Sequence, residues 1–230
     1  MNIIVNGGTR GIGKEVAVYL SRDNMNRIII TGRNESALKK LSNDFNNIIS
    51  LGLDLSDFDC QMITFMEKVQ KHFKTVDILI NMAGSLVIKE FINMTNAEAR
   101  KMMETNFFGP ASVIRILKPL MPRGSHIVNI SSMGGFQGSL KYSGLSYYSA
   151  SKAALACLSE CLAAEFNESG ISVNCLAPSA VQTEMFNEAF PGYTAPVSPE
   201  DMAEFIAGFA LKWHKFFNGK ILPVALENPE

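Results

Sequence analysis

Val5-Asn6-Gly7-Gly8-Thr9-Arg10-Gly11-Ile12-Gly13 is a short apolar run that ends in a turn with glycines at positions 7, 11 and 13. Residues 2–6 predict a buried strand, and residues 14–21 predict a helix. Glycine is needed where a turn is tight and where the backbone must approach a phosphate group closely. The helix after the turn offers free N–H groups and the positive end of its dipole. A glycine triplet alone can be just a turn, but between a strand and a helix it predicts a nucleotide-binding site.

Strands and helices alternate along the rest of the chain. Apolar runs predict strands at 2–6, 27–31, 48–53, 76–81, 126–130, 172–176 and 220–224. Helical periodicity predicts helices at 14–21, 35–45, 58–73, 97–117, 147–167 and 199–213. Continuous apolar strands joined by crossover helices are typical of a parallel sheet that is covered on both faces. We therefore expect an α/β fold: a single doubly wound Rossmann-type domain over residues 1–230, with a seven-stranded, mostly parallel sheet and helices on both faces.

The composition restricts the kind of partner and the compartment. The formal net charge is -1 and no basic run stands out, which gives no support for nucleic-acid binding. No apolar stretch approaches the roughly 18 residues of a membrane span. The chain begins directly in a predicted strand, without the pattern of a signal peptide. We expect a cytoplasmic protein with neither a nucleic-acid nor a membrane partner.

Cysteines and histidines are too scattered to predict a metal site or a disulfide framework. No pair has C-x-x-C spacing, so small buried hydrophobes are the simpler interpretation of the cysteines. A serine hydrolase would need one of the histidines, and no G-x-S-x-G motif accompanies them. The residues are Cys60, Cys157, Cys161 and Cys175, with His72, His126 and His214.

The stretch Tyr148-Ser149-Ala150-Ser151-Lys152 opens the predicted helix at 147–167. Residues four positions apart lie on one face of a helix, so the Tyr148 phenol and the Lys152 ammonium are neighbours. A nearby cation is expected to lower the phenol pKa from about 10. Tyr148 is therefore a candidate proton donor or acceptor near neutral pH. This spacing also arises by chance on solvated helix faces, so the pair needs support from other motifs.

That support comes from the glycine turn, Asn81-Met82-Ala83-Gly84, Asn106 and Ser131-Ser132. Together with the tyrosine and lysine, these features resemble the short-chain dehydrogenase/reductase family, over about residues 2–225. The resemblance implies hydride transfer between a carbonyl carbon and a nicotinamide ring. Its implied catalytic residues are Asn106, Ser132, Tyr148 and Lys152.

The resemblance gives each of these residues a role. Tyr148 donates a proton to the carbonyl oxygen, and Ser132 hydrogen-bonds the same oxygen. Lys152 holds the nicotinamide ribose and favours the tyrosinate. Asn106 bends its helix and anchors a water, with a solvent-facing asparagine as the alternative. Ser131 is expected to bond the backbone of its own turn instead.

The resemblance also implies a set of cofactor-binding residues. These are Gly7, Thr9, Arg10, Gly11, Ile12, Gly13, Arg33, Asp54, Asn81, Ala83, Gly84, Tyr148, Lys152, Pro178, Val181 and Thr183. In this set, Asp54 accepts a hydrogen bond from the adenine amino group, although it could equally be a helix N-cap. Val181 and Thr183 hold the carboxamide of the nicotinamide.

Arg33 predicts which nucleotide is preferred. It follows Gly32 at the end of the second strand, where a carboxylate would bind the ribose 2′-OH of NAD. A guanidinium instead attracts a 2′-phosphate, and Arg10 offers a second cation. We therefore expect NADP (NADPH); the alternative is that both arginines are ordinary surface charges.

Several stretches depart from the family pattern. Ser132 and Tyr148 are farther apart than is usual, and the extra residues fall in 134–146, which we expect to shape the pocket. Ser179 stands where the family has glycine, which puts the backbone angle there in doubt. Residues 184–197 are expected to form a short substrate lid. The C-terminal strand lacks the usual Gly-Gly, which puts one family interface in doubt.

The substrate stays open at this point. The pattern is most similar to 3-oxoacyl-[acyl-carrier-protein] reductases, whose acidic partner needs basic residues beside the pocket. Arg123 stands at one such place, whereas Ser169 stands at another where arginine is common. The alternatives are a free sugar, polyol or other small ketone or alcohol, or a non-catalytic NADP-binding protein. The helices expected to carry Asn106 and Tyr148 have apolar faces, near Val113 and Leu155, and such helices pair in the family, so the resemblance implies a homodimer or homotetramer.

Overall fold

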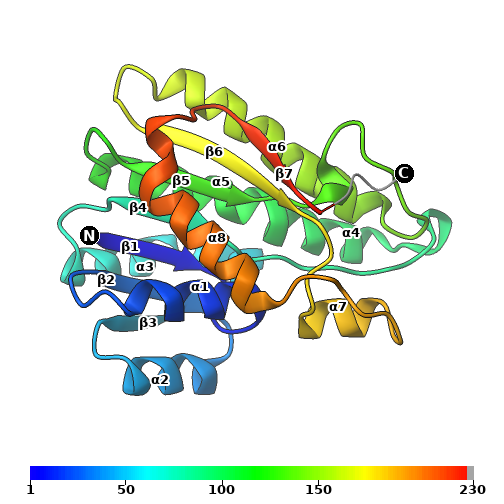
Figure 1. The fold of residues 1–230 in the computed structure, drawn as a ribbon, viewed down its shortest axis with the longest axis horizontal. Coiled ribbons are helices and arrows are strands. Elements are labelled where there is room, and N and C mark those ends of the chain that lie inside the picture. The colour runs from blue at the N-terminus through cyan, green and yellow to red at the C-terminus, as the bar shows by residue number, and fades with distance from the viewer. Residues whose placement is uncertain (227–230) are drawn as a thin grey trace.

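A parallel sheet of seven strands forms the centre of the molecule, in the order β3-β2-β1-β4-β5-β6-β7 (Figure 1). The computed structural model describes residues 1–226. Every pair of neighbouring strands is parallel. The strands are β1 (Asn2–Asn6), β2 (Arg27–Gly32), β3 (Ile48–Gly52), β4 (Ile78–Asn81), β5 (His126–Ile130), β6 (Ser172–Pro178) and β7 (Ile221–Val224). The predicted α/β fold with its seven-stranded sheet is confirmed.

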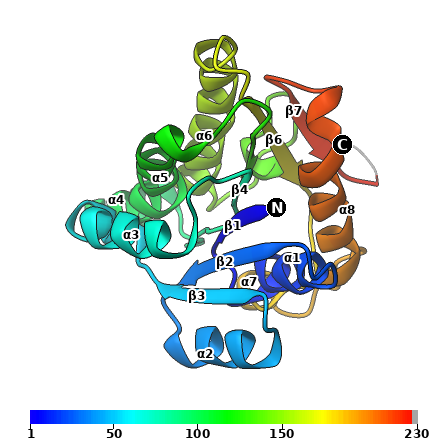
Figure 2. The same cartoon turned by 90° about the vertical axis from the view of Figure 1, so that its left-hand side faces the viewer.

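Helices cover both faces of this sheet (Figure 2). They are α1 (Gly11–Ser21), α2 (Glu35–Asp44), α3 (Phe58–His72), α4 (Asn96–Met103), α5 (Gly109–Leu117), α6 (Ser146–Glu165), α7 (Glu184–Ala189) and α8 (Pro199–Lys212). Side chains of α1, α2 and α8 pack in one apolar core, and those of α3, α5 and α6 pack in the other. None of these helices within residues 1–226 is both long enough and apolar enough to cross a bilayer.

The alternation of side chains along β1 explains the two cores. Ile3 and Val5 point into the core with α1 and α8, while Ile4 points into the opposite core. All three side chains are fully buried. Burying such a side chain contributes about 1.5–3 kcal/mol, so a one-residue slip of register would cost the strand its packing on both faces.

Most predicted elements differ from the structure by one or two residues at an end, and three differences are larger. Helix α1 begins at Gly11 rather than at residue 14, because its first turn is made by the glycine stretch itself. The long helix predicted at 97–117 is interrupted by a π-helical turn, Glu104–Phe108, between α4 and α5. The predicted lid contains a short helix, α7, that the irregular pattern of 184–197 did not indicate.

A chain of buried polar side chains crosses the sheet. The Thr31 hydroxyl donates to Asn6 Oδ1 (3.0 Å), Asn6 Nδ2 donates to Asn81 Oδ1 (2.7 Å), and Asn81 Nδ2 donates to Asn129 Oδ1 (2.7 Å). Asn129 Nδ2 then donates to the Ser159 hydroxyl on α6 (2.9 Å). These side chains come from β2, β1, β4 and β5 in register. Because an unpaired buried amide is costly, the chain holds the four strands and α6 in one alignment.

His126 is a buried ring held in one tautomer. Its Nδ1 lies 3.0 Å from the Ala210 carbonyl, which can only accept, and its Nε2 lies 3.0 Å from the Asn174 amide nitrogen, which can only donate. The neutral ring with the proton on Nδ1 satisfies both partners. Burial lowers the pKa of His126 to about 4, with His214 adding to the effect.

Acidification is expected to destabilise the fold through His126. Its folded-state pKa lies below the usual 6.5, so the stabilisation is complete above pH 6.5 and is lost as the pH falls toward 4. The loss is on the order of 3 kcal/mol. Urea unfolding at pH 7 and pH 5 checks this: His126→Gln should flatten the pH dependence of the unfolding free energy. His72→Gln, at the end of α3, is the control. If the unfolding free energy of H126Q changes between pH 7 and pH 5 as much as that of the wild type, His126 is not the group responsible.

Candidate active site

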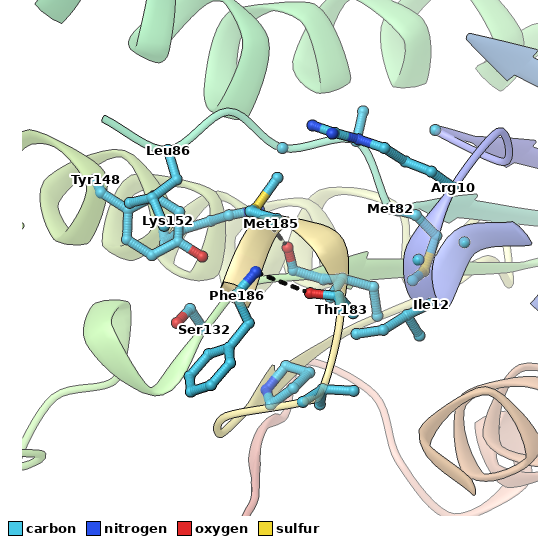
Figure 3. Close-up of a pocket in the computed structure, with 18 of the residues that line it drawn as sticks. Arg10, Ile12, Met82, Leu86, Ser132, Tyr148, Lys152, Thr183, Met185 and Phe186 are labelled. Atoms are coloured by element: carbon cyan, nitrogen blue, oxygen red, sulfur yellow. Dashed lines mark hydrogen bonds between the residues drawn. The ribbon is translucent and has the colours of Figure 1, made fainter. Parts of the chain in front are cut away.

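A crevice of about 1400 Å³ lies at the carboxyl ends of the strands. It is centred where the strand order reverses between β1 and β4, which is where open α/β sheets bind ligands. The glycine turn lines one end, and Ser132, Tyr148 and Lys152 line the other (Figure 3). One crevice therefore joins the two motifs that lie far apart in the sequence.

The glycine turn is shaped to let a ligand approach the backbone. Gly7 has φ +85°, and a Cβ on it would lie 2.6 Å from the Ala83 backbone. A Cβ on Gly13 would lie 2.1 Å from the Gly7 carbonyl oxygen. No side chain caps the N-terminus of α1, and no acidic residue stands in its first turn. The free N–H groups there fit the phosphates of a dinucleotide.

Two cations, Arg10 and Arg33, line the end of the crevice that is formed by the glycine turn and the end of β2. A Cβ on Gly32 would lie 2.5 Å from Thr9 Cγ2, so any side chain at this position would require Thr9 to shift. Arg33, the next residue, lines the crevice and is exposed. Arg10 extends from the glycine turn, at the opposite end from Tyr148 and Ser132 (Figure 3). The two guanidinium groups are thus available to an anionic ligand.

Asp54 both caps a turn and lines the crevice. Its carboxylate accepts from the Ser56 backbone N–H (3.0 Å) and hydroxyl (2.8 Å), at the start of a 3-10 turn. Burial acts to raise the pKa of Asp54, but these bonds and the charge of Arg33 outweigh it and lower the pKa. The two roles expected for Asp54 are therefore compatible, because one oxygen serves the turn and the second stays available.

Ser132 and Tyr148 meet around Gly134. A Cβ on Gly134 would lie 3.6 Å from the Ser132 hydroxyl and 3.8 Å from the Tyr148 ring. These are ordinary van der Waals distances, so the loop after β5 lies directly beside both side chains. Tyr147, the rival phenol, does not line the crevice and stacks on Phe91 with ring centroids 5.7 Å apart. Of the two neighbouring tyrosines, only Tyr148 reaches the crevice.

The expected lowering of the Tyr148 pKa is not found. Burial raises the pKa of Tyr148, and the Ser132 hydroxyl only partly opposes this. Lys152 Nζ donates instead to the Ile130 carbonyl (2.9 Å), and burial lowers the pKa of Lys152 to about 8. The sequence spacing predicted that the two residues share one helix face, but it did not predict their hydrogen-bond partners. The neutral phenol, which is the proton-donating form, is the one that this arrangement favours.

Asn106 is fully buried within the π-helical turn, so the solvent-facing alternative is wrong. Its Oδ1 accepts from the Ser85 backbone N–H (2.7 Å), and its Nδ2 donates to the Ser85 carbonyl (2.9 Å) and the Ser151 hydroxyl (2.9 Å). The bend expected at Asn106 is present. The residue joins the segment after Gly84 to the helix that carries Tyr148 and Lys152.

The nicotinamide end is bordered by the segment after β6. Pro178, Val181 and Thr183 line the crevice there. Thr183 also caps α7, because its hydroxyl accepts from the Phe186 N–H (3.1 Å; Figure 3). Ser179 causes no strain, since no non-glycine residue among those described has a positive φ.

Most of the predicted site residues line this crevice; the exceptions are Asn81 and Asn106, which lie behind its wall. The hydrogen-bond partner expected for Ser131 was wrong, because its hydroxyl donates to the Lys152 carbonyl on α6 (2.8 Å) rather than to the backbone of its own turn. Asn129 was missed as the neighbour of Asn81, although an asparagine inside the apolar run Ile127-Val128-Asn129-Ile130 was a signal. At the apolar end of the crevice, Tyr142 and Leu145 come from the segment expected to shape the pocket and Met185 and Phe186 from the expected lid. Leu86 and Met133 line the same end and were not predicted.

Arg123 lies away from the crevice. It precedes β5, at the amino end of a strand whose carboxyl end leads to Ser132. Its guanidinium donates to the Glu168 carbonyl (2.7 Å), next to Ser169. Within one chain, the cation that suggested a carrier-protein partner therefore lies toward the amino ends of the strands, whereas the candidate catalytic residues lie at their carboxyl ends.

Comparisons with known proteins agree with this geometry. The family described as short chain dehydrogenase matches residues 1–194. An uncharacterized oxidoreductase of Staphylococcus saprophyticus is 30% identical over 208 residues, which cover 87% of each chain. The mouse dehydrogenase/reductase SDR family member 7B is 33% identical over 194 residues, which cover 80% of this chain and 58% of that protein.

Solved structures show the same fold. A dehydrogenase/reductase from Sinorhizobium meliloti superposes with a TM-score of 0.83 at 27% identity, covering 97% of this chain and 92% of the other. BdcA, solved in complex with NADPH, superposes with a TM-score of 0.85 at 24% identity, covering 97% and 92%. With the family match over most of the chain and a crevice that unites the glycine turn with Ser132, Tyr148 and Lys152, this protein belongs to the short chain dehydrogenase family of oxidoreductases.

Proposed function

We propose that the protein reduces a ketone to an alcohol with NADPH, using Tyr148 as the proton donor. The observation that supports this most is the meeting of Ser132, Tyr148 and Lys152 at one end of a crevice whose other end carries the glycine turn. NADPH, when bound, supplies the hydride. The protein supplies the proton and the charge stabilisation.

Each polar side chain has a separate task in this reaction. The neutral Tyr148 hydroxyl donates its proton to the carbonyl oxygen, and the Ser132 hydroxyl hydrogen-bonds the same oxygen. Lys152 uses one of its three hydrogens on the Ile130 carbonyl, which leaves two for ribose hydroxyls. Asn106 positions this group through Ser85 and Ser151, and a water-mediated proton relay past it is part of the proposal.

The choice of NADPH rests on Arg33 and on the space at Gly32. A guanidinium can bind a 2′-phosphate bidentately, and residue 32, where a carboxylate would bind the ribose 2′-OH of NAD, is a glycine packed against Thr9. Arg10 adds a second cation on the same crevice.

The finer substrate assignment is a 3-oxoacyl group, free or on an acyl carrier. The position of Arg123 gives the carrier little support within one chain. A sugar, polyol or other small ketone or alcohol is the alternative, and a non-catalytic NADP-binding protein is a further one. Assays with 3-oxoacyl thioesters against simple ketones separate these substrates.

Further expectations remain predictions: one domain over residues 1–230, a cytoplasmic location, and a homodimer or homotetramer. Val113 and Leu155, two of the apolar residues on the helices that pair in the family, are buried within the chain, so a contact between copies would use other side chains of these helices.

Tyr148→Phe is expected to lower kcat for ketone reduction by roughly 10²–10⁴-fold, because the proton donor is lost. NADPH affinity, measured by fluorescence titration, should stay nearly unchanged. Tyr147→Phe removes a hydroxyl one residue away, outside the crevice, and is the matched control. Turnover by Y148F at the wild-type rate would refute the role of this phenol.

Arg33→Asp is expected to weaken NADPH binding by roughly 10- to 100-fold, since it replaces a charge-assisted contact with repulsion. NADH binding should change far less. Lys39→Asp makes the same charge change on the exposed side of α2 and controls for net charge. Dissociation constants for both nucleotides test the idea, and an equal loss for the two would exclude a 2′-phosphate contact.

The rate of reduction is expected to fall above about pH 8. Lys152 has a pKa of about 8, so its charge is present below that pH and lost above it. Tyr148 keeps its proton over the same range, because burial raises its pKa. Initial rates from pH 6 to pH 10 measure the profile. In Lys152→Arg, the fall in rate should move to a higher pH, because a guanidinium stays charged. If the rate of K152R still falls near pH 8, the titrating group is not Lys152.

A further inference from the structure

A second cavity, of about 590 Å³, adjoins the substrate end of the crevice. Its lining comes from residues 90–92 and 141–146, with Ser149. Tyr142 and Leu145 line both cavities, so they form the boundary that the two share. We call this second cavity the outer groove.

The rim of the outer groove is unusually apolar for a surface. Ile88, Phe91 and Ile92 on one side are 40%, 64% and 85% exposed, and Leu140 and Tyr142 on the other are 44% and 55% exposed. Exposed apolar side chains that gather at one place mark a binding surface, whereas scattered ones do not.

The charged groups of the outer groove are already partnered. Lys141 Nζ donates to the Phe136 carbonyl (2.7 Å) and to the Ser139 hydroxyl (2.7 Å). The Glu90 carboxylate accepts from the Asn93 amide (3.0 Å). Three serines, Ser143, Ser146 and Ser149, also line the groove, and its apolar surface comes from Phe91, Ile92, Tyr142 and Leu145.

The walls of the groove are held in place before any ligand binds. The Lys89 N–H donates to the Gly144 carbonyl (3.0 Å), and Gly144 has φ +81°. A Cβ on Gly144 would lie 2.9 Å from Ile88 Cγ2, so the two segments are in direct contact. Phe91 stacks on Tyr147, which ties the outer wall to α6. A preformed groove costs little ordering free energy on binding.

We propose that the substrate is a ketone with an unbranched apolar chain, whose carbonyl lies at Ser132 and Tyr148 and whose chain passes Tyr142 into the outer groove. This inference rests on the proposed function and names the substrate class of the same site. The inner end agrees with it, since Leu86, Met133, Met185 and Phe186 line the crevice beside the catalytic residues. A sugar or polyol would leave hydroxyl groups unpaired against these side chains.

A homologous series tests the length of the chain. The series runs from 2-butanone through 2-hexanone and 2-octanone to 2-decanone, measured as kcat/KM with NADPH. Each methylene that enters the groove should raise kcat/KM by up to roughly fourfold. In parallel, calorimetric titration of the matching 2-alkanols into the enzyme–NADPH complex measures affinity without turnover, because neither the alcohol nor the reduced nucleotide can accept a hydride.

Phe91→Asp and Ile92→Asp test the place where the chain binds. Both side chains are largely exposed, so the fold should tolerate the change. Each variant should remove the advantage of 2-decanone over 2-butanone in rate and in affinity while keeping the 2-butanone rate. Ile63→Asp, on α3 at 71% exposure and outside both cavities, is the matched control and should keep the full advantage.

The outcomes separate the two proposals. An affinity that does not rise with chain length, or a rise that survives in both F91D and I92D, overturns the apolar chain even if ketones are reduced. Absence of turnover with every ketone, including 3-oxoacyl thioesters, overturns the proposed function. In that case the alkanol affinities still test whether an apolar chain binds in the outer groove. If F91D changes the oligomeric state but keeps the preference for long-chain ketones, the exposed apolar side chains form a contact between copies of the protein. That result also overturns the proposal of an apolar substrate chain in the outer groove.

Discussion

The buried ammonium of Lys152 is the constraint on which the arrangement of the site depends. Lys152 is 3% exposed, and an unpaired charge at such a position is costly. Its Nζ donates to the Ile130 carbonyl at the end of β5, and the Ser131 hydroxyl donates back to the Lys152 carbonyl. These reciprocal bonds hold the end of β5 against the first turns of α6. Ser132 follows the strand and Tyr148 precedes the lysine by one helical turn, so both are positioned by the same contact.

The crevice changes character along its length. At the glycine turn it offers free N–H groups and the cations Arg10 and Arg33, which suit phosphates. At the other end, the polar groups are few and the surrounding side chains are apolar. A hydroxyl or ammonium is electrostatically more effective in such surroundings than in water. Burial also keeps the Tyr148 proton in place, because it raises the phenol pKa.

Most of the architecture could be predicted because strands and helices have different periods. Buried strands are rich in Ile, Val and Leu; β1 and β5 have the predicted bounds, and the other strands differ by one or two residues at one end. Prediction failed where the local signal is weak. The π-helical turn at Asn106 depends on contacts to Ser85 and Ser151, which lie far away in the sequence. Helix α7 is short, and its cap by Thr183 forms within a segment without periodicity.

Sequence by itself determined the fold class, the strand–turn–helix at the glycine stretch and the candidate residues, because these depend on spacing of a few residues along the chain. Tertiary structure alone decided which groups each side chain meets. It directed Lys152 to the Ile130 carbonyl, buried Asn106, placed Arg123 before the amino end of β5, and joined residues 90–92 with 141–146 into the outer groove. Hydrogen-bond partners and burial set pKa values and specificity, and both come from residues brought together only when the chain is folded.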